Sequence, residues 1–337
     1  MGFAVIIPTK DRPQLLQAAI GSVLSQSVQP DEVIVVDDGS SADTLAVIRS
    51  LVAAAGPHVR MIELVSVPGG HGPAYSRNTG VLASHSSHLC FLDDDDTWID
   101  NDYLASIANS LVLEADPFDL HFFNQRAFDG EREVLQSIWI AELKDIVRNR
   151  QAGTGGTYKV SIQDLLRCTG FCHLNTTCVR REFFDTIGGF NDEIRYESDR
   201  DFFFRAIDRA HCMKYTPRHI ARHNIPNPTV GVNVSTSFSQ YNRWLIQLRI
   251  VEDLSLKAQH SEIRAYGRRY RAYTLKRIAK SLYDDRQYRR AMSHAKMGLL
   301  AGFTLRWAIF TVWATAMAFW IEPIRSTRRQ PALRTTQ

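Results

Sequence analysis

Four consecutive carboxylates, Asp93 to Asp96, directly follow the apolar segment 88–92. Adjacent negative charges repel one another, so the run needs an offset from water, a helix N-terminus or a divalent cation. A calcium EF-hand is excluded, because the sixth and twelfth positions counted from Asp93 are Trp98 and Leu104 instead of glycine and glutamate. An Asp-x-Asp element after a buried strand suits Mg²⁺ or Mn²⁺, which bind carboxylate and diphosphate oxygens. An acidic first helical turn is the simpler alternative, and the run alone leaves both open.

Three further segments carry groups that suit a nucleotide or a proton transfer. In VIVVDDGSS (33–41), two aspartates and a glycine follow a strand pattern and fit either a nucleoside or a capped turn. In GGHGPAYSRNTG (69–80), glycines allow close backbone approach and Arg77 can hold a phosphate; a flexible loop with a solvated arginine is the alternative. In YESDRDFFFRA (196–206), carboxylates lie beside phenylalanines that can tune an acid into a base; an amphipathic helix is the alternative.

Two nucleotide-binding motifs are missing from the sequence. No G-x-G-x-x-G follows the first strand pattern, and no G-x-x-x-x-G-K-[ST] occurs anywhere in the chain. Their absence argues against a dinucleotide-binding enzyme and against a P-loop ATPase. No nucleic-acid partner is expected.

The elements that must position these groups alternate between strands and helices over the first 125 residues. Five short apolar runs predict buried strands: they are AVIIP (4–8), EVIVVD (32–37), VRMIELV (59–65), HLCFLD (88–93) and DLHFFN (119–124). Helical spacing of apolar residues between the first two runs, and a capping box at Ser40 and Asp43 after the second, predict helices. This alternation is typical of a mainly parallel sheet with helices on both faces and ligands at the carboxyl ends of its strands.

The C-terminal third differs in pattern and in charge. From about Ser235 onward the pattern is helical, and residues 257–337 hold 17 Lys or Arg against 4 Asp or Glu, although the whole chain has a net charge of only +4. Residues 307–321 are the most apolar stretch, too short to span a bilayer unless 298–304 joins it. The last helix of a soluble bundle is one alternative; the basic charge favours association with an anionic membrane surface.

The cysteines and the N-terminus point to a reducing compartment. Five cysteines form no scaffold spacing, and the group Cys168, Cys172, His173 and Cys178 favours buried thiols over a zinc site, since a second ligand pair at zinc spacing is missing. The N-terminal residues lack the basic region and the apolar length of a signal peptide.

Six motifs together resemble a known family. VIIPTKDRP, VVDDGS, G-x-x-x-S-R-N-x-G, FLDDDDTW, GGFND and SDRDFFFR occur in this order over residues 3–225. In this combination the sequence resembles the family 2 glycosyltransferases of GT-A fold. The resemblance implies an α/β fold, a Rossmann-like mixed and mainly parallel sheet flanked by helices, here with an α-helical C-terminal extension. It also implies an inverting, metal-dependent transfer of a sugar from a nucleotide-sugar, most often a UDP-sugar.

The resemblance also implies a role for individual residues. Asp199 is the expected general base, aligned through DRDFFFR. The expected nucleotide-sugar contacts are Pro8, Thr9, Arg12, Asp38, Arg77, Asp93 and Asp94. The expected metal ligands for Mn²⁺ or Mg²⁺ are Asp95, Asp93 (directly or in the outer shell) and His223. The residues expected on the acceptor side are Asp96, Trp98, Glu197 and Ser198, with Ser198 standing where the family has a glutamate.

These expectations give one functional hypothesis and two rivals. Residues 1–230 form the glycosyltransferase domain, and residues 231–330 form a basic, helical, membrane-associating region. The enzyme transfers a hexosyl-type sugar to a glycan or lipid-linked acceptor in cell-surface polysaccharide synthesis, at the cytoplasmic face of the membrane. The rivals are a sugar-phosphate nucleotidyltransferase, which would need a glycine-rich basic loop after the first strand, and an inactive sugar-nucleotide-binding protein.

Overall fold

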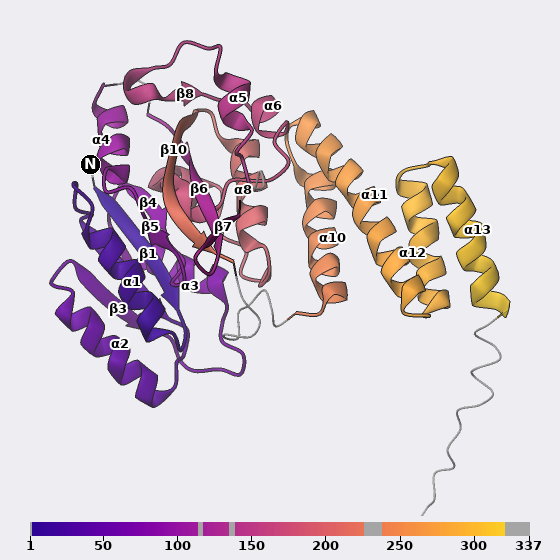
Figure 1. The fold of residues 1–337 in the computed structure, drawn as a ribbon, viewed down its shortest axis with the longest axis horizontal. Coiled ribbons are helices and arrows are strands. Elements are labelled where there is room, and N and C mark those ends of the chain that lie inside the picture. Colours follow the sequence, from indigo (N-terminus) through magenta and orange to yellow (C-terminus); the bar gives the residue numbers. More distant parts are fainter. Residues whose placement is uncertain (1, 114–116, 135–138, 226–237, 321–337) are drawn as a thin grey trace, which may run out of the picture. The chain divides into compact units, whose positions relative to one another are not determined.

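The computed structural model describes residues 2–113, 117–134, 139–225 and 238–320. The chain forms two compact units, Met1–Ser237 and Phe238–Gln337. The first contains a sheet flanked by helices, and the second is helical in its described part (Figure 1).

The first unit is organised around one mixed sheet, with strand order β3-β2-β1-β4-β9-β6-β10-β5; β7 pairs with β6 and β8 with β10. The strands β3, β2, β1 and β4 are parallel, β9 runs opposite to its neighbours β4 and β6, and β10 runs parallel to β6. The strands are β1 (Phe3–Thr9), β2 (Glu32–Asp37), β3 (Val59–Glu63), β4 (His88–Phe91), β5 (Thr97–Trp98), β6 (Leu120–Asp129), β7 (Arg132–Val134), β8 (Tyr158–Lys159), β9 (Thr177–Arg180) and β10 (Met213–Asn224). All five predicted strands are therefore present.

Helices connect these strands. They are α1 (Pro13–Leu24), α2 (Ala42–Ala54), α3 (Pro73–Ala83), α4 (Tyr103–Leu113), α5 (Leu143–Val147), α6 (Ile162–Leu165), α7 (Arg181–Thr186) and α8 (Ser198–Arg209), with 3₁₀ turns η1 (Thr154–Gly156) and η2 (Leu174–Thr176). The capping box predicted at Ser40 is wrong: the N-cap of α2 is Ser41, without a side-chain cap. The Ser40 hydroxyl instead donates to Asp37 and accepts from the Asp11 N–H.

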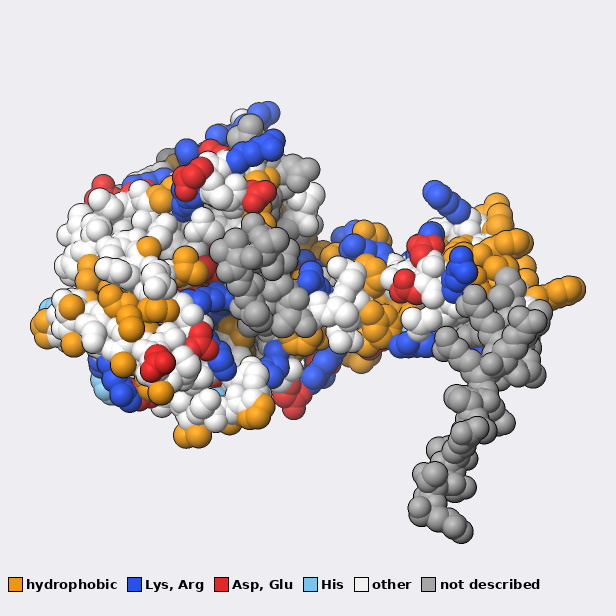
Figure 2. Space-filling model, turned by 60° about the horizontal axis from the view of Figure 1, so that its bottom comes forward, with side chains coloured by type: hydrophobic (Ala, Val, Ile, Leu, Met, Phe, Trp, Pro, Cys, Tyr) orange, Lys and Arg blue, Asp and Glu red, His pale blue; other side chains and the backbone are white. Residues whose placement is uncertain are grey.

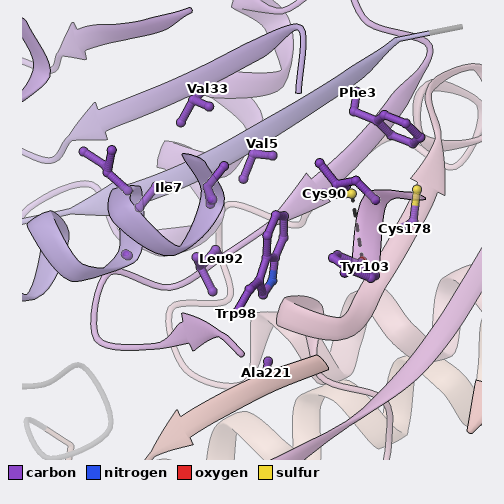
Figure 3. Packing of buried hydrophobic residues seen from close by; sticks show 14 of the residues in the cluster. Phe3, Val5, Ile7, Val33, Cys90, Leu92, Trp98, Tyr103, Cys178 and Ala221 are labelled. Carbon is purple, nitrogen blue, oxygen red and sulfur yellow. Dashed lines mark hydrogen bonds between the residues drawn. The ribbon is translucent and has the colours of Figure 1, made fainter. Parts of the chain in front are cut away.

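Alternate residues of a strand point to the same face of the sheet, and those of β1 contribute to a hydrophobic core on one face. Val5 and Ile7 of β1 point to the same side and pack in one buried cluster with apolar residues of α1, α2 and α4 (Figure 3). Trp98 and Tyr103 complete this cluster, their rings 4.8 Å apart in an edge-on arrangement.

The opposite face of the sheet is covered more closely. Ile6 of β1 and Val36 of β2 face Gly80 of α3, where a Cβ atom would collide with the Ile6 side chain. Because Gly80 has no side chain, α3 can approach the sheet closely enough to bring Arg77, one turn earlier, towards the end of β4.

The second unit consists, in its described part, of α10 (Gln240–Lys257), α11 (Ser261–Asp284), α12 (Tyr288–Ala301) and α13 (Leu305–Trp320). Trp244, Leu248, Leu275 and Ile278 contribute to one core cluster, and alanines join α11, α12 and α13 in another. Residues 298–304 do not extend the apolar stretch that begins at residue 307 into one longer helix, because α12 ends at Ala301 and α13 begins at Leu305. Among the described residues, no helix has both the length and the apolar character required to cross a bilayer.

All five cysteines are free thiols. Cys90 and Cys178 lie opposite each other in the β4–β9 pairing, and the Tyr103 hydroxyl donates to Cys90 Sγ at 3.9 Å. Burial raises the pKa of Cys168 to about 12 and that of Cys172 to about 11.

Candidate active site

The residues that could do chemistry meet at one edge of the sheet. Thr9 ends β1, Asp93 follows β4, and His223 lies near the end of β10. The carboxyl ends of these strands share an edge, since β1, β4, β6 and β10 all run in the same direction. The opposite direction of β9 brings the residues just before it, the turn η2, to this same edge.

The aspartate run forms a tight turn between β4 and β5, so it is not the first turn of a helix. The Asp96 N–H donates to the Asp93 carbonyl at 3.1 Å, and α4 begins only at Tyr103. Arg77, buried on α3, donates to Asp93 Oδ1 at 2.5 Å. Although burial acts to raise it, the pKa of Asp93 is lowered to about 2 by the charges of Arg77 and His173. Asp93 is therefore a carboxylate at neutral pH.

Asp94 and Asp95 share Arg12 from the β1–α1 connection. Arg12 Nη1 lies 3.1 Å from Asp94 and 3.2 Å from Asp95, and the Thr9 hydroxyl donates to Asp94 at 2.8 Å. Burial raises the pKa of Asp94 to about 6. Burial and the neighbouring charges of Asp96 and Asp94 also raise the pKa of Asp95. One arginine thus offsets only part of the negative charge in this turn.

Asp96 is completely buried, and its carboxylate accepts three hydrogen bonds. It accepts from Asn175 Nδ2 at 2.5 Å, from His223 Nδ1 at 2.8 Å and from the Asn224 N–H at 2.7 Å. Against the lowering effect of burial, Asp96 raises the pKa of His223 to about 9. A carboxylate that binds Nδ1 orients the ring and leaves Nε2 for another ligand.

His173 and Asn175, in and beside η2, are site residues that the motif analysis missed. His173 Nδ1 accepts from the Asn175 N–H at 3.4 Å, so in the neutral ring the proton lies on Nε2. That Nε2 is 3.9 Å from Asp93 and 3.8 Å from Asp199. Burial and the charge of His223 lower the pKa of His173. In the sequence, His173 lies near three cysteines and was considered only as a zinc ligand. Its carboxylate neighbours become visible only in the fold.

Asp199 lies in the first turn of α8, and its Oδ1 accepts from the Arg200 N–H at 2.9 Å. Glu197 precedes the helix in a left-handed backbone conformation, with φ of 57°. It lies 3.1 Å from the Arg200 guanidinium, while Ser198 is buried near Arg77, whose Nη1 is 3.5 Å from its hydroxyl. Glu197 and Ser198 thus flank Asp199 on the approach to α8.

Asp38 holds the glycine-rich loop in place. Its carboxylate accepts from the N–H groups of His71, at 2.6 Å, and Gly72, at 2.9 Å. Gly70 has φ of +69°, and a Cβ there would overlap the Asp38 carboxylate. Pro8, half-buried, lies in β1 next to Thr9. The loop before α3 and the end of β1 are distant in sequence. Asp38 holds this loop at the edge of the sheet where β1 ends.

The donor set fits a divalent cation. Asp96, His173 and His223 offer ligand atoms that all lie within 4.8 Å of one another. Beside them, burial and the neighbouring carboxylates raise the pKa of Asp95, and a cation would relieve the repulsion between these carboxylates. Carboxylate and imidazole ligands in this combination suit Mn²⁺ and related ions.

The structure brings most of the expected residues together. Contacts within the run and around it link Thr9, Arg12, Arg77, Asp93, Asp94, Asp95, Asp199 and His223. Three of the residues expected on the acceptor side are buried, namely Asp96, Trp98 and Ser198. Asp96 supports His223, and Trp98 packs in the core with its indole N–H bonded to the Asn175 carbonyl at 3.0 Å.

Sequence comparison identifies the domain. Residues 4–170 match the description Glycosyl transferase family 2. A relative from Campylobacter jejuni, named GalNAc(5)-diNAcBac-PP-undecaprenol beta-1,3-glucosyltransferase, is 30% identical over 128 residues, which cover 38% of this chain and 39% of the relative. A PGL/p-HBAD biosynthesis glycosyltransferase from Mycobacterium bovis BCG is 26% identical over 205 residues, 61% of this chain and 69% of the relative. An uncharacterized glycosyltransferase from Haemophilus influenzae is 31% identical over 109 residues, which cover 32% of this chain and 42% of the relative.

Solved structures share the fold. The S. aureus TarS fragment 1–349 in complex with UDP-GlcNAc superposes with a TM-score of 0.65 at 18% identity, covering 94% of this chain and 88% of that fragment. The mannosyltransferase PcManGT from Pyrobaculum calidifontis, in complex with GDP-Man and Mn²⁺, gives a TM-score of 0.52 at 17% identity, over 96% and 82% of the two chains. The predicted GT-A type of mixed sheet is confirmed. On this family match, the segment 4–170 of the chain belongs to glycosyltransferase family 2.

Proposed function

We propose that this protein is an inverting, metal-dependent glycosyltransferase that moves a hexosyl group from a UDP-sugar to a hydroxyl of a glycan or lipid-linked acceptor. The observation that carries the proposal is the position of Asp199. Its carboxylate and that of Asp93 approach the same His173 Nε2, at 3.8 and 3.9 Å. The Asp199 carboxylate therefore lies beside the aspartate turn without being part of it, where an acceptor could be deprotonated.

We expect the nucleotide-sugar donor to be bound by the arginines and by the glycine-rich loop around the aspartate turn. Arg77 and Arg12 face the diphosphate, Asp38 accepts from the base, and Pro8 and Thr9 line the nucleoside pocket. Asp95 and His223 would hold the cation, with Asp93 as a direct or outer ligand and Asp94 towards the ribose. A bound Mn²⁺ or Mg²⁺ would supply Lewis-acid stabilisation of the leaving nucleoside diphosphate. Asp96 keeps the His223 ring in the orientation this requires.

The acceptor side uses Asp199 as the general base. The acceptor oxygen forms a bond to the anomeric carbon while its proton passes to the Asp199 carboxylate. The bond from that carbon to the diphosphate oxygen breaks, and its electron pair stays on the oxygen of the departing nucleoside diphosphate. One displacement from the opposite face inverts the anomeric centre. Glu197 and Ser198 adjoin Asp199 and would contact the acceptor.

Substrate class and location are supported by the relatives and by charge. TarS is described with UDP and UDP-GlcNAc, which supports a UDP-sugar donor. The C. jejuni relative's name includes an undecaprenol-linked glycan, which supports a lipid-linked acceptor and a part in cell-surface polysaccharide synthesis. We assign sugar transfer to residues 1–230 and membrane association, at the cytoplasmic face, to the basic region 231–330, of which residues 231–237 and 321–330 lie outside the described part of the chain.

A panel of nucleotide-sugars tests the proposal directly. UDP-, GDP- and dTDP-sugars are titrated with and without Mn²⁺ by calorimetry, and slow hydrolysis of each is followed by nucleoside diphosphate release. We expect Mn²⁺-dependent binding and hydrolysis with a UDP-sugar. Asp199→Asn should keep donor binding and lose transfer, whereas Asp95→Ala should lose Mn²⁺-dependent binding. Binding of no nucleotide-sugar, or the reverse pattern in the two variants, contradicts the proposal.

A further inference from the structure

The outward face of α13 is apolar along its whole length. Six large side chains on it are 56–78% exposed: they are Leu305, Ile309, Val312, Trp313, Phe319 and Trp320. At 3.6 residues per turn these positions fall on one continuous stripe. We call this stripe the α13 face. From Ile309 to Trp320 the helix contains no charged residue.

The other side of α13 is already packed. Thr311, Ala314 and Ala318 are buried, and Ala314 belongs to a cluster with Ala279 of α11 and Ala295 of α12. The Thr311 hydroxyl lies 3.4 Å from the Ala295 carbonyl. The outer helix of a soluble bundle normally presents polar residues to water, and α13 has the reverse arrangement. Trp307 and Phe310 also pack against this cluster, and the Trp313 indole N–H donates to the Tyr283 hydroxyl. The six side chains of the α13 face nevertheless remain more than half exposed.

Cations surround this apolar helix in the sequence and on the helices beside it. Residues 238–320 hold 15 Lys or Arg against 5 Asp or Glu. Arg306 is exposed on α13, and Arg289, Arg290 and Lys296 are exposed on α12. In the space-filling view, hydrophobic and basic side chains both gather on the C-terminal unit (Figure 2). An apolar stripe accompanied by basic residues matches the interface of an anionic bilayer.

We propose that the α13 face docks in the plane of a membrane that contains anionic lipids. Sixteen residues of helix reach about 24 Å, short of the ~30 Å hydrocarbon core, so α13 lies in the interface. Tryptophans suit that depth, where an apolar ring meets a polar boundary. A second copy of this chain is disfavoured as the occupant, because two units with the same excess of positive charge repel each other.

This inference specifies the membrane partner proposed above, and it can be tested apart from sugar transfer. The full chain is mixed with vesicles of phosphatidylcholine, alone or with phosphatidylglycerol, and bound protein is measured by flotation. Binding should require phosphatidylglycerol and weaken as salt rises. Ile309→Asp places a charge on the α13 face and should weaken vesicle binding by about tenfold or more. Val112→Asp, at an exposed valine of α4 in the first unit, is the matched control and should bind like the wild type.

Two further measurements keep the outcome clear. UDP binding and circular dichroism of each variant show that the first unit is intact, so loss of vesicle binding with normal UDP binding supports the docking face. Absence of vesicle binding by the wild type, or equal binding by Ile309→Asp, overturns the inference. So does a dimer in sedimentation that Ile309→Asp dissociates, since the occupant would then be a second copy. Vesicle binding without any nucleotide-sugar binding would leave the docking face standing and refute the transferase proposal.

Discussion

Asn175 connects the two ends of the aspartate turn, and its removal gives a sharp test of how the site is held. Its Oδ1 accepts the Asp93 N–H at 3.1 Å, and its Nδ2 donates to Asp96 Oδ2 at 2.5 Å. The side chain is completely buried, so water cannot replace either bond without rearrangement. Asn175→Ala therefore leaves a buried N–H and a buried carboxylate each without one partner.

The size of the effect follows from the two bonds. A neutral bond contributes about 1 kcal/mol and a bond to a buried carboxylate about 2 kcal/mol, so Asn175→Ala should lower the free energy of unfolding by about 3 kcal/mol. Asn124 is the matched control, since it is also buried and its Nδ2 donates to the neutral Tyr215 hydroxyl at 2.7 Å. Asn124→Ala removes the same atoms and should cost about 1 kcal/mol.

Urea unfolding followed by circular dichroism measures both variants, with the slope of free energy against urea checked for equality. Mn²⁺-dependent UDP binding is then measured under conditions where each variant is folded. We expect Asn175→Ala to weaken that binding and Asn124→Ala to leave it unchanged. Equal stability losses in the two variants, or a loss below about 1 kcal/mol for Asn175→Ala, would refute the assignment of Asn175 as the support of the turn.

Two other predictions concern acid stability and the glycine-rich loop. Burial lowers the pKa of His121 to about 3, so its stabilising contribution is full above the unfolded value near 6.5 and is lost as the pH falls towards 3. His121→Phe should therefore shrink the loss of unfolding free energy between pH 7 and pH 5 by about 2 kcal/mol, measured by urea titration at both pH values; an unchanged loss contradicts it. Gly70→Ala should weaken UDP binding several-fold, because its Cβ would push Asp38 aside. Gly56→Ala, at φ of +102° with open space around it, has the backbone strain alone and should bind UDP normally; equal weakening in both would disprove the role of the overlap.

Much of the fold could be predicted because its signals are local. Short apolar runs such as 32–37 and 88–91 can be buried strands only where both faces of a sheet are covered, and the helical spacing before the second strand is equally direct. The reversed direction of β9 could not be predicted, because it depends on pairing with β4 and β6, which are distant in sequence. The capping box failed because Ser40 is used by Asp37 and Asp11, a choice that local sequence does not reveal.

The site was predictable only where a motif names its residues. Thr9, Arg77 and the aspartate turn are brought together as the motif order implies. His173 and Asn175 belong to no motif used, and they reach the turn because β9 runs backwards. The burial of individual site residues could not be predicted either. A run of four aspartates looks uniformly polar in sequence, yet Asp96 is buried.

The buried thiols allow chemical labelling to report when this protein unfolds. A thiol reacts with alkylating reagents as the thiolate, and burial raises the pKa of Cys168, Cys172 and Cys178 above their ordinary range. Native molecules should therefore remain unlabelled at these positions near neutral pH, and each molecule that opens should be marked irreversibly. Mass spectrometry of maleimide-treated samples would then count opening events at Cys178 in β9 separately from those at Cys168, which follows α6, without any spectroscopic probe.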